Sequence, residues 1–213
     1  MFYNDEDWHS PTTDDNGVIK NKLGLTNEEE LNKAERLITS YKLAQLFLNP
    51  GRQTFDVAHY LAIHKYLFND IYPFAGEIRS EMISKRIPFC MPLLIYSNLK
   101  ETLAKARAKV PYLTDKDKLL TYIPILYSDL DIIHPFREGN GRTLREFIRQ
   151  YIDFVCKHNN LEPYYIDFSL LADRREEYVD AVVKADAQMD YQDLQMLFTE
   201  TLRVKQDTQK KEL

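Results

Sequence analysis

Glycine is scarce in this sequence, which has 6 glycines and 9 prolines among its 213 residues. Few glycines, together with long apolar runs at helical spacing, favour a mostly α-helical domain. Cysteine is scarcer still. Cys90 and Cys156 do not stand in a spacing typical of metal ligands, and such low cysteine use fits a reducing compartment.

The sequence also lacks any run of about 20 apolar residues, the length that a membrane-spanning helix needs. Its first residues are acidic rather than basic, and no apolar stretch follows them, so they do not resemble a secretory signal. We therefore expect a cytoplasmic protein without membrane contact. The net charge of −5 suits DNA or RNA poorly, and we expect no direct nucleic-acid binding.

The chain has the balance of a folded protein, with 44% hydrophobic and 29% charged residues. We predict one helical domain over residues 21–204, preceded by an irregular arm (1–20) and followed by a polar, frayed tail (205–213). Helices are predicted directly after a capping box at Thr26 and as far as about 48, over 54–69, in a segment ending near 109, over 119–133, from after Gly141 to about 155, and over 171–188 and 190–204.

The clearest helix is the one that ends at residue 133. Its apolar residues are spaced four, three, four and three apart: Leu119, Ile123, Leu126, Leu130 and Ile133. Pro124 inside this pattern predicts either a kink or a later helix start. Pro135 ends the helix because a residue that precedes proline is pushed out of the α conformation. His134 is therefore predicted at the C-terminal edge of a core helix.

Residues 76–92 differ from the rest of the chain because they show no helical period and contain Gly76, Pro88 and Pro92. We predict a short β-hairpin over residues 80–89, with Lys85 and Arg86 near its tip.

The segment His134–Arg145 (HPFREGNGRTLR) combines features that point to chemistry. Gly139-Asn140-Gly141 opens a helix, and the free N–H groups at a helix start, with the helix dipole, favour an anion. Arg142, Arg145 and Arg149 share one face of that helix, and arginine suits phosphate oxygens.

Two further side chains of this segment complete a reaction centre. Glu138 would repel phosphate unless a cation lay between them, and Mg²⁺ bridges carboxylates and phosphates. His134 titrates near neutral pH and can act as a base. Together these features predict nucleotide transfer to a hydroxyl. Each feature alone also has a structural interpretation: a helix-end histidine, an ordinary turn, or a solvated arginine face in which Glu146 pairs with Arg142 or Arg149.

The same segment resembles the Fic-family signature H-P-F-x-[D/E]-G-N-G-R-x-x-R at every position. Residues 67–79 are similar to the family segment that leads into its flap, and residues 193–198 are similar to the closing helix of small bacterial Fic toxins. The resemblance implies an all-α Fic fold, a helical bundle around the motif helices with a β-hairpin flap. It also implies transfer of AMP from ATP to a Ser, Thr or Tyr hydroxyl of a target protein.

The resemblance assigns a role to each matching residue. His134 would deprotonate the target hydroxyl, Glu138 would hold Mg²⁺, and Gly139, Asn140 and Gly141 would form the anion hole. Arg142 and Arg145 would bind the phosphates that leave as pyrophosphate. Phe136 would anchor the loop in the core. The flap would clamp the target backbone as an added strand, with Ile83 and Lys85 as its candidate binding residues.

Other activities remain as alternatives. A Doc-like kinase would bind ATP reversed and transfer the γ-phosphate, but Doc-type loops carry lysine where this chain has Gly141. Phosphocholine transfer is a more distant variant. A non-catalytic nucleotide-binding module would not need an intact His134 and Glu138.

Control of the reaction is the last expectation. Many Fic enzymes are inhibited by a helix with the motif [S/T]-x-x-x-E-[G/N], whose glutamate pairs with the second motif arginine, here Arg145. Three segments match only in part, because none ends in Gly or Asn: Thr26–Leu31, Ser97–Thr102 and Thr208–Leu213. We therefore expect a bacterial toxin that is inhibited in trans by a separate antitoxin helix. By analogy with small Fic toxins, its target would be a type II topoisomerase.

Overall fold

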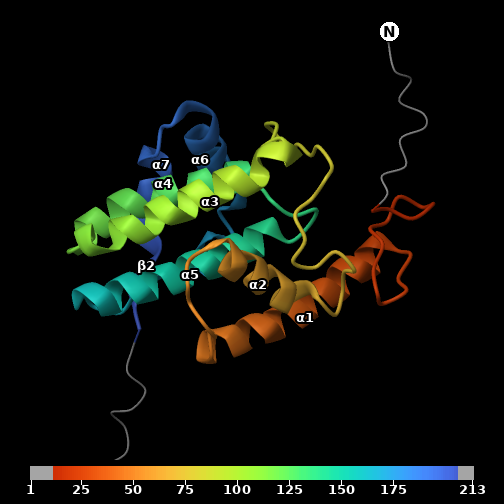
Figure 1. The fold of residues 1–213 in the computed structure, drawn as a ribbon, viewed down its shortest axis with the longest axis horizontal. Helices are drawn as coiled ribbons and strands as arrows, with labels where there is room; N and C mark the ends of the chain where they lie inside the picture. Colours follow the sequence, from red (N-terminus) through yellow and green to blue (C-terminus); the bar gives the residue numbers. More distant parts are fainter. Residues whose placement is uncertain (1–11, 206–213) are drawn as a thin grey trace, which may run out of the picture. The chain divides into compact units, whose positions relative to one another are not determined.

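The computed structural model describes residues 12–205. This part of the chain contains seven α-helices, two 3₁₀ turns and two short strands (Figure 1). In chain order they are α1 (Glu28–Leu48), α2 (Val57–Phe68), α3 (Pro92–Lys109), η1 (Val110–Tyr112), α4 (Lys116–Ile133), α5 (Asn140–Asn159), β1 (Tyr164–Ile166), η2 (Phe168–Leu171), α6 (Arg175–Gln188), α7 (Gln192–Thr201) and β2 (Leu202–Val204). The expected helical class is confirmed.

The chain divides into two compact units. One comprises the described part of Met1–Gly51 together with Leu61–Glu77, and the other comprises Arg52–Tyr60 and the described part of Ile78–Leu213. The whole His134–Arg145 segment lies in the second unit. The domain boundaries expected from the sequence at residues 20 and 204 stay predictions, and most of the predicted arm and tail lies outside the described residues.

In the first unit, α1 begins one residue later than the capping box predicted. Asn27 is the N-cap, and its side-chain oxygen accepts a hydrogen bond from the Glu30 N–H at 3.1 Å. The assignment of Thr26 as the cap is therefore wrong; asparagine fills this position as well as threonine does. The unit contains polar contacts in its interior: the Tyr72 hydroxyl donates to buried Glu35, and the half-buried Gly76 N–H donates to Nδ1 of buried His64 at 2.8 Å.

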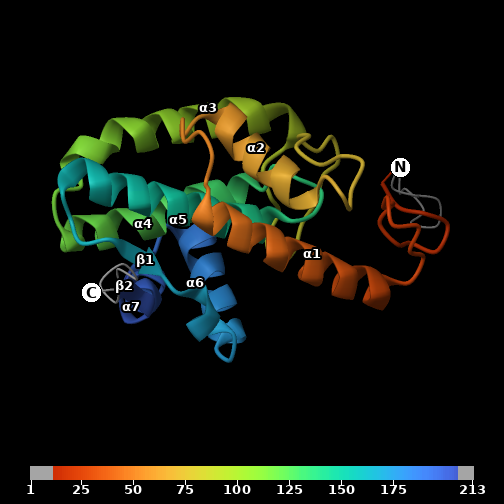
Figure 2. The same ribbon diagram turned by 90° about the horizontal axis from the view of Figure 1, so that it is seen from below.

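In the second unit, α4 is the central helix and packs against α3, α5, α6 and α7. Figure 2 shows α3 and the α6–α7 pair on opposite sides of α4 and α5. The predicted stripe is fully enclosed, with every member at most 3% exposed: Leu119, Ile123, Leu126, Leu130 and Ile133. Burying such a stripe on several sides fixes α4, and therefore fixes the position of the residue that follows it.

Pro124 does not mark a late start of α4. The helix begins at Lys116, where the Asp115 carboxylate caps it by accepting from the Lys118 N–H at 2.9 Å, and Pro124 is a buried residue inside it. The end of the helix is as predicted, because Ile133 is its last residue. None of the described helices is long and apolar enough to span a membrane.

The C-terminal part of the described chain differs from the expectation in four places. Helix α7 ends at Thr201 instead of 204, because Leu202–Val204 pairs antiparallel with Tyr164–Ile166. Helix α6 begins at Arg175, after a 3₁₀ turn, and α5 continues beyond Val155 to Asn159. Lys205 is not frayed: its ammonium group pairs with Asp153 at 2.8 Å, and its N–H donates to the Pro163 carbonyl.

Candidate active site

His134 follows the last residue of α4 and has a left-handed backbone, with φ 44° and ψ 62°. This conformation is uncommon for a residue other than glycine. It is held here because Pro135 prevents continuation of the helix while the buried stripe fixes α4. The His134 side chain is only 7% exposed.

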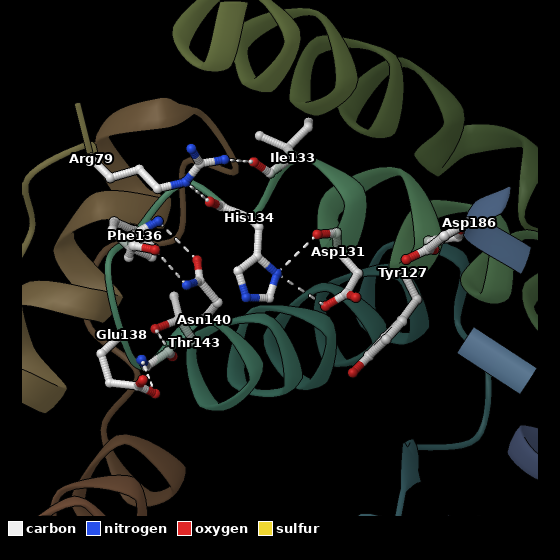
Figure 3. Close-up of polar contacts among 12 residues, drawn as sticks. Arg79, Tyr127, Asp131, Ile133, His134, Phe136, Glu138, Asn140, Thr143 and Asp186 are labelled. Carbon is white, nitrogen blue, oxygen red and sulfur yellow. Dashed lines mark hydrogen bonds and ion pairs between the residues drawn. The ribbon is translucent and has the colours of Figure 1, made fainter. Parts of the chain in front are cut away.

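One ring nitrogen of His134 is committed to a hydrogen bond. Nδ1 lies 3.1 Å from the main-chain oxygen of Asp131, and Figure 3 shows the ring directed at that residue. A carbonyl oxygen only accepts, so Nδ1 holds the hydrogen and the lone pair of the neutral ring is on Nε2. Nε2 is the nitrogen that can take a proton from a substrate.

The surroundings of His134 keep its imidazole neutral. Its ring stacks on Phe89, with ring centres 3.7 Å apart and planes 12° apart. Burial, with a smaller contribution from the positive charges of Lys85 and Arg79, lowers the pKa of His134 to about 3. A neutral imidazole at physiological pH has the protonation state that a general base requires.

Arg79 holds the main chain around His134. Its Nε donates to the His134 carbonyl at 2.7 Å, and its N–H donates to the Pro135 carbonyl at 2.9 Å. Its other guanidinium nitrogens donate, at 2.6 Å each, to the carbonyls of Glu81 and Cys90. Arg79 therefore ties the end of α4 to both ends of the predicted flap. No pattern in the sequence indicates this role.

The loop after His134 is fixed by two side chains. Phe136 is fully buried and stacks on Tyr60, with ring centres 5.9 Å apart, so its predicted anchoring in the core is confirmed. The Asn140 side chain accepts from the Phe136 N–H at 2.8 Å and donates to the Phe136 carbonyl at 2.7 Å. Because Asn140 uses its side chain to close the loop, what it offers an anion is its main-chain N–H.

Helix α5 starts directly after Gly139, whose φ of 82° suits glycine. The first helical hydrogen bond runs from the Thr143 N–H to the Gly139 carbonyl at 3.1 Å, so the N–H groups of Asn140 and Gly141 precede it. N–H groups at this position have no partner within the helix and favour an anion. Glu138 lies beside them, since its carboxylate accepts from the Gly139 N–H at 2.9 Å.

The predicted row of three arginines is reduced to two. Arg149 makes a bidentate pair with buried Glu146, at 2.8 and 2.6 Å, which confirms the structural interpretation for this residue. Arg142 lies 4.0 Å from Glu138, near the start of α5.

Arg145 lies beside the glycine loop. Its guanidinium would be 3.2 Å from a β-carbon at Gly141, so glycine there leaves it space. It hydrogen-bonds the hydroxyls of Tyr127 and Tyr178 and lies over the Phe168 ring. Sequence reasoning missed both tyrosines; α4 and α6 bring them together from distant parts of the chain.

The predicted hairpin is present only as a turn closed by one isolated bridge, because residues 80–89 form no strand. Ser84 and Pro88 form an antiparallel bridge, and the Phe89 N–H donates to the Ile83 carbonyl at 3.3 Å, which leaves Lys85 and Arg86 at the turn. Lys85 is near enough to His134 and Asp131 to act on both electrostatically. For Ile83 the structure gives a main-chain role in the hairpin.

Comparison with known proteins identifies the family. A model of the Fic/DOC family matches residues 54–152. The probable protein adenylyltransferase y4lH of Sinorhizobium fredii is 30% identical over 152 residues, which cover 68% of this chain and 78% of that protein. The chain belongs to the Fic/DOC family.

Two further relatives support this assignment. The protein adenylyltransferase VbhT of Bartonella schoenbuchensis is 33% identical to this Fic chain over 145 residues. These residues cover 67% of the chain but only 30% of VbhT. The N-terminal Fic domain of a VirB-translocated Bep effector from Bartonella quintana, with bound ADP, has a TM-score of 0.74 and 25% identity, with 88% of this chain and 92% of that one covered.

The Fic site fits a magnesium ion that is held jointly by the protein and by substrate phosphates. It does not fit a metal ion held by protein ligands alone. Within residues 12–205, no group of three or more His, Cys, Asp or Glu side chains could hold a metal ion. Mg²⁺ is commonly held by one or two carboxylates together with substrate phosphates and water. The Glu138 carboxylate, 42% exposed and beside the start of α5, fits that arrangement.

Proposed function

We propose that this chain transfers AMP from ATP to a hydroxyl group of a target protein and releases pyrophosphate. The observation that supports this most directly is the state of His134. It is a neutral imidazole, its Nδ1 is occupied by Asp131, and its Nε2 is left to act as a base, six residues before Asn140, the first residue of a helix whose start favours phosphate. The names of VbhT and y4lH and the ADP in the Bartonella quintana structure agree with the proposal.

In the proposed reaction, the target hydroxyl gives its proton to Nε2 of His134. The hydroxyl oxygen forms a bond to the α-phosphorus, and the bond from that phosphorus to the bridging oxygen of the β-phosphate breaks. Pyrophosphate leaves with the electron pair of the broken bond. The N–H groups of Asn140 and Gly141 and the guanidinium groups of Arg142 and Arg145 stabilise the negative charge on the phosphates.

Glu138 would hold Mg²⁺, which neutralises phosphate charge when it is bound. The flap would position the target. Its short bridge leaves main-chain groups along residues 80–89 that an extended target segment could pair with as an added strand. Lys85, at the hairpin turn and near His134, would attract the negatively charged phosphates.

The test is a comparison of two labels. The chain is incubated with Mg²⁺, a bacterial lysate and ATP labelled at either the α- or the γ-phosphate. We expect the α-label on a protein band and labelled pyrophosphate from the γ-labelled sample. If only the γ-label reaches protein, the nucleotide binds in the reversed orientation and the Doc-like alternative is correct. If neither label is transferred but ATP still binds, the chain is a nucleotide-binding module.

A further inference from the structure

Two carboxyl groups lie together behind the candidate base. Asp131 is on α4, one turn before His134, and its carboxylate lies 3.7 Å from Nδ1 of His134 (Figure 3). Asp186 is on α6, and its carboxyl group is within hydrogen-bonding reach of that of Asp131. Asp186 also accepts a 2.6 Å hydrogen bond from the Ser128 hydroxyl. The Asp131 side chain is 16% exposed.

A hydrogen bond between two carboxyl groups requires a proton on one of them, because an ionised carboxylate only accepts. Burial raises the pKa of Asp131, but the hydrogen bond with Asp186 and the cations Lys85 and Arg145 favour its ionised form and oppose that rise. Burial and the negative charge of Asp131 raise the pKa of Asp186 to about 8. The proton therefore resides on Asp186 at neutral pH. The other titratable groups that face the pair or the imidazole are Tyr60 on α2, Arg79, Tyr127 and Asp129 on α4, Tyr178 on α6, and Tyr191 just before α7.

We propose that Asp131 and Asp186 are positioning residues for His134: protonated Asp186 donates to Asp131 and keeps its carboxylate ionised beside Nδ1. This inference rests on the proposed function, in which His134 is the base. When Nε2 takes the proton of the target hydroxyl, the ring becomes positively charged, and the Asp131 carboxylate stabilises that charge. The proton of Asp186 stays in place throughout, so the step adds one proton to His134 and none to the pair.

The size of the effect follows from distance. An opposite charge within about 4–6 Å changes the proton affinity of a titratable group by about ten- to thousand-fold. Part of that change stabilises a transition state in which the proton is partly transferred to His134. Because Asp131 does not reach the phosphates in this scheme, its effect belongs in kcat and not in the KM for ATP.

The kinetic test uses Asp131→Asn, which preserves the shape of the side chain and removes its charge. We expect kcat for AMP transfer to fall about ten- to hundred-fold, with the KM for ATP changed less than about two-fold. The matched control is Asp117→Asn, an exposed aspartate in the first turn of the same helix, at the opposite end from Asp131. It should behave like the unmodified chain. An unchanged kcat in Asp131→Asn would overturn the proposal.

A second measurement does not depend on activity. Infrared spectra of the nucleotide-free chain should contain the carbonyl stretch of a protonated carboxyl group at pH 7. This band should disappear as the pH rises through about 8, and should be missing in Asp186→Asn. Absence of the band from the unmodified chain at pH 7 would overturn the shared proton even if Asp131→Asn fails to fold. If the band is present and the unmodified chain transfers no AMP, the proposed function has failed while the carboxyl pair stands.

Discussion

At the scale of single residues, His134 is defined by its local bonds. The main-chain oxygen of Asp131 fixes its tautomer, and Phe89 covers one face of its ring. His134→Ala should lower AMP transfer by about 10²–10⁴-fold, the usual effect of losing a general base, while ATP binding persists. The measurement is the transfer rate at saturating ATP, with binding followed separately by calorimetry.

His158 is the matched control for that prediction. It is an exposed histidine in the last turn of α5, where its ring stacks on Phe154. His158→Ala removes the same side chain from the same unit without touching the candidate site, so its transfer rate should be unchanged. Full activity in purified His134→Ala would show that another group is the base.

The buried carboxyl pair also predicts how stability depends on pH. The pKa of Asp186 is raised by burial to about 8 in the folded chain, above its value in the unfolded chain. The folded state therefore binds more protons, and stability falls as the pH rises through about 8. His134, whose pKa is lowered by burial to about 3, acts in the opposite direction only below pH 6.5.

Between pH 6.5 and 8.5, therefore, Asp186 affects the pH dependence of stability and His134 does not. The unmodified chain should lose stability across this range, measured as the denaturant midpoint, and Asp186→Asn should lose less. If Asp186 has an ordinary pKa, the denaturant midpoints of the two proteins should change with pH at the same rate. That result would contradict the assignment.

At the scale of elements, the hairpin flap is attached to α6 by its tip. Arg86 pairs with Glu176 at 2.7 Å and with Asp180, and all three side chains are well exposed. Exposed ion pairs contribute little to stability and are screened by salt. Arg86→Ala should therefore leave the thermal midpoint unchanged but increase amide hydrogen exchange at Lys85 and Phe89, whose N–H groups donate within the hairpin.

Salt provides an internal check on that prediction. High salt should speed flap exchange in the unmodified chain and have little further effect in Arg86→Ala. Lys105→Ala is the matched control, because it removes an exposed pair with Glu101 on α3 and should leave flap exchange unchanged. If flap exchange in Arg86→Ala equals that of the unmodified chain at low salt, the ion pairs do not hold the flap.

The elements also show how far sequence reasoning reaches. The end of α4 and the hairpin were predicted because local signals set them: an apolar stripe, Pro135, and a segment without helical period. The strand Leu202–Val204 was not predicted. It ends the helix by pairing with Tyr164–Ile166, which is far away in the chain. The contacts of Arg79 and the pairing of Asp131 with Asp186 are long-range in the same way.

At the scale of the whole molecule, the open question is what inhibits the proposed reaction. Arg145 is the residue that an inhibitory glutamate would engage in Fic enzymes of the regulated kind. Its guanidinium bonds the hydroxyls of Tyr127 and Tyr178, which are neutral partners that a carboxylate or a phosphate could compete with. Of the partial inhibitory motifs, Glu101 is committed to Lys105 on the surface of α3, and Glu212 lies outside the described residues.

We therefore predict that the chain alone is active and that a separate short helical protein inhibits it. Purified chain should transfer AMP without any activating substitution, and Glu30→Gly and Glu212→Gly should not raise its rate, since neither glutamate is followed by Gly or Asn. A synthetic helical peptide bearing the complete [S/T]-x-x-x-E-[G/N] motif should lower the rate in a concentration-dependent way. The same peptide with glutamine in place of its glutamate should not, because the neutral side chain forms only a weak bond with Arg145.

Arg145→Lys tests the same pair from the other side. It retains the charge but loses the planar guanidinium that binds a carboxylate through two hydrogen bonds, so inhibition should weaken by a larger factor than activity. A chain that is inactive alone and becomes active on Glu30→Gly or Glu212→Gly would place the inhibitor within this sequence.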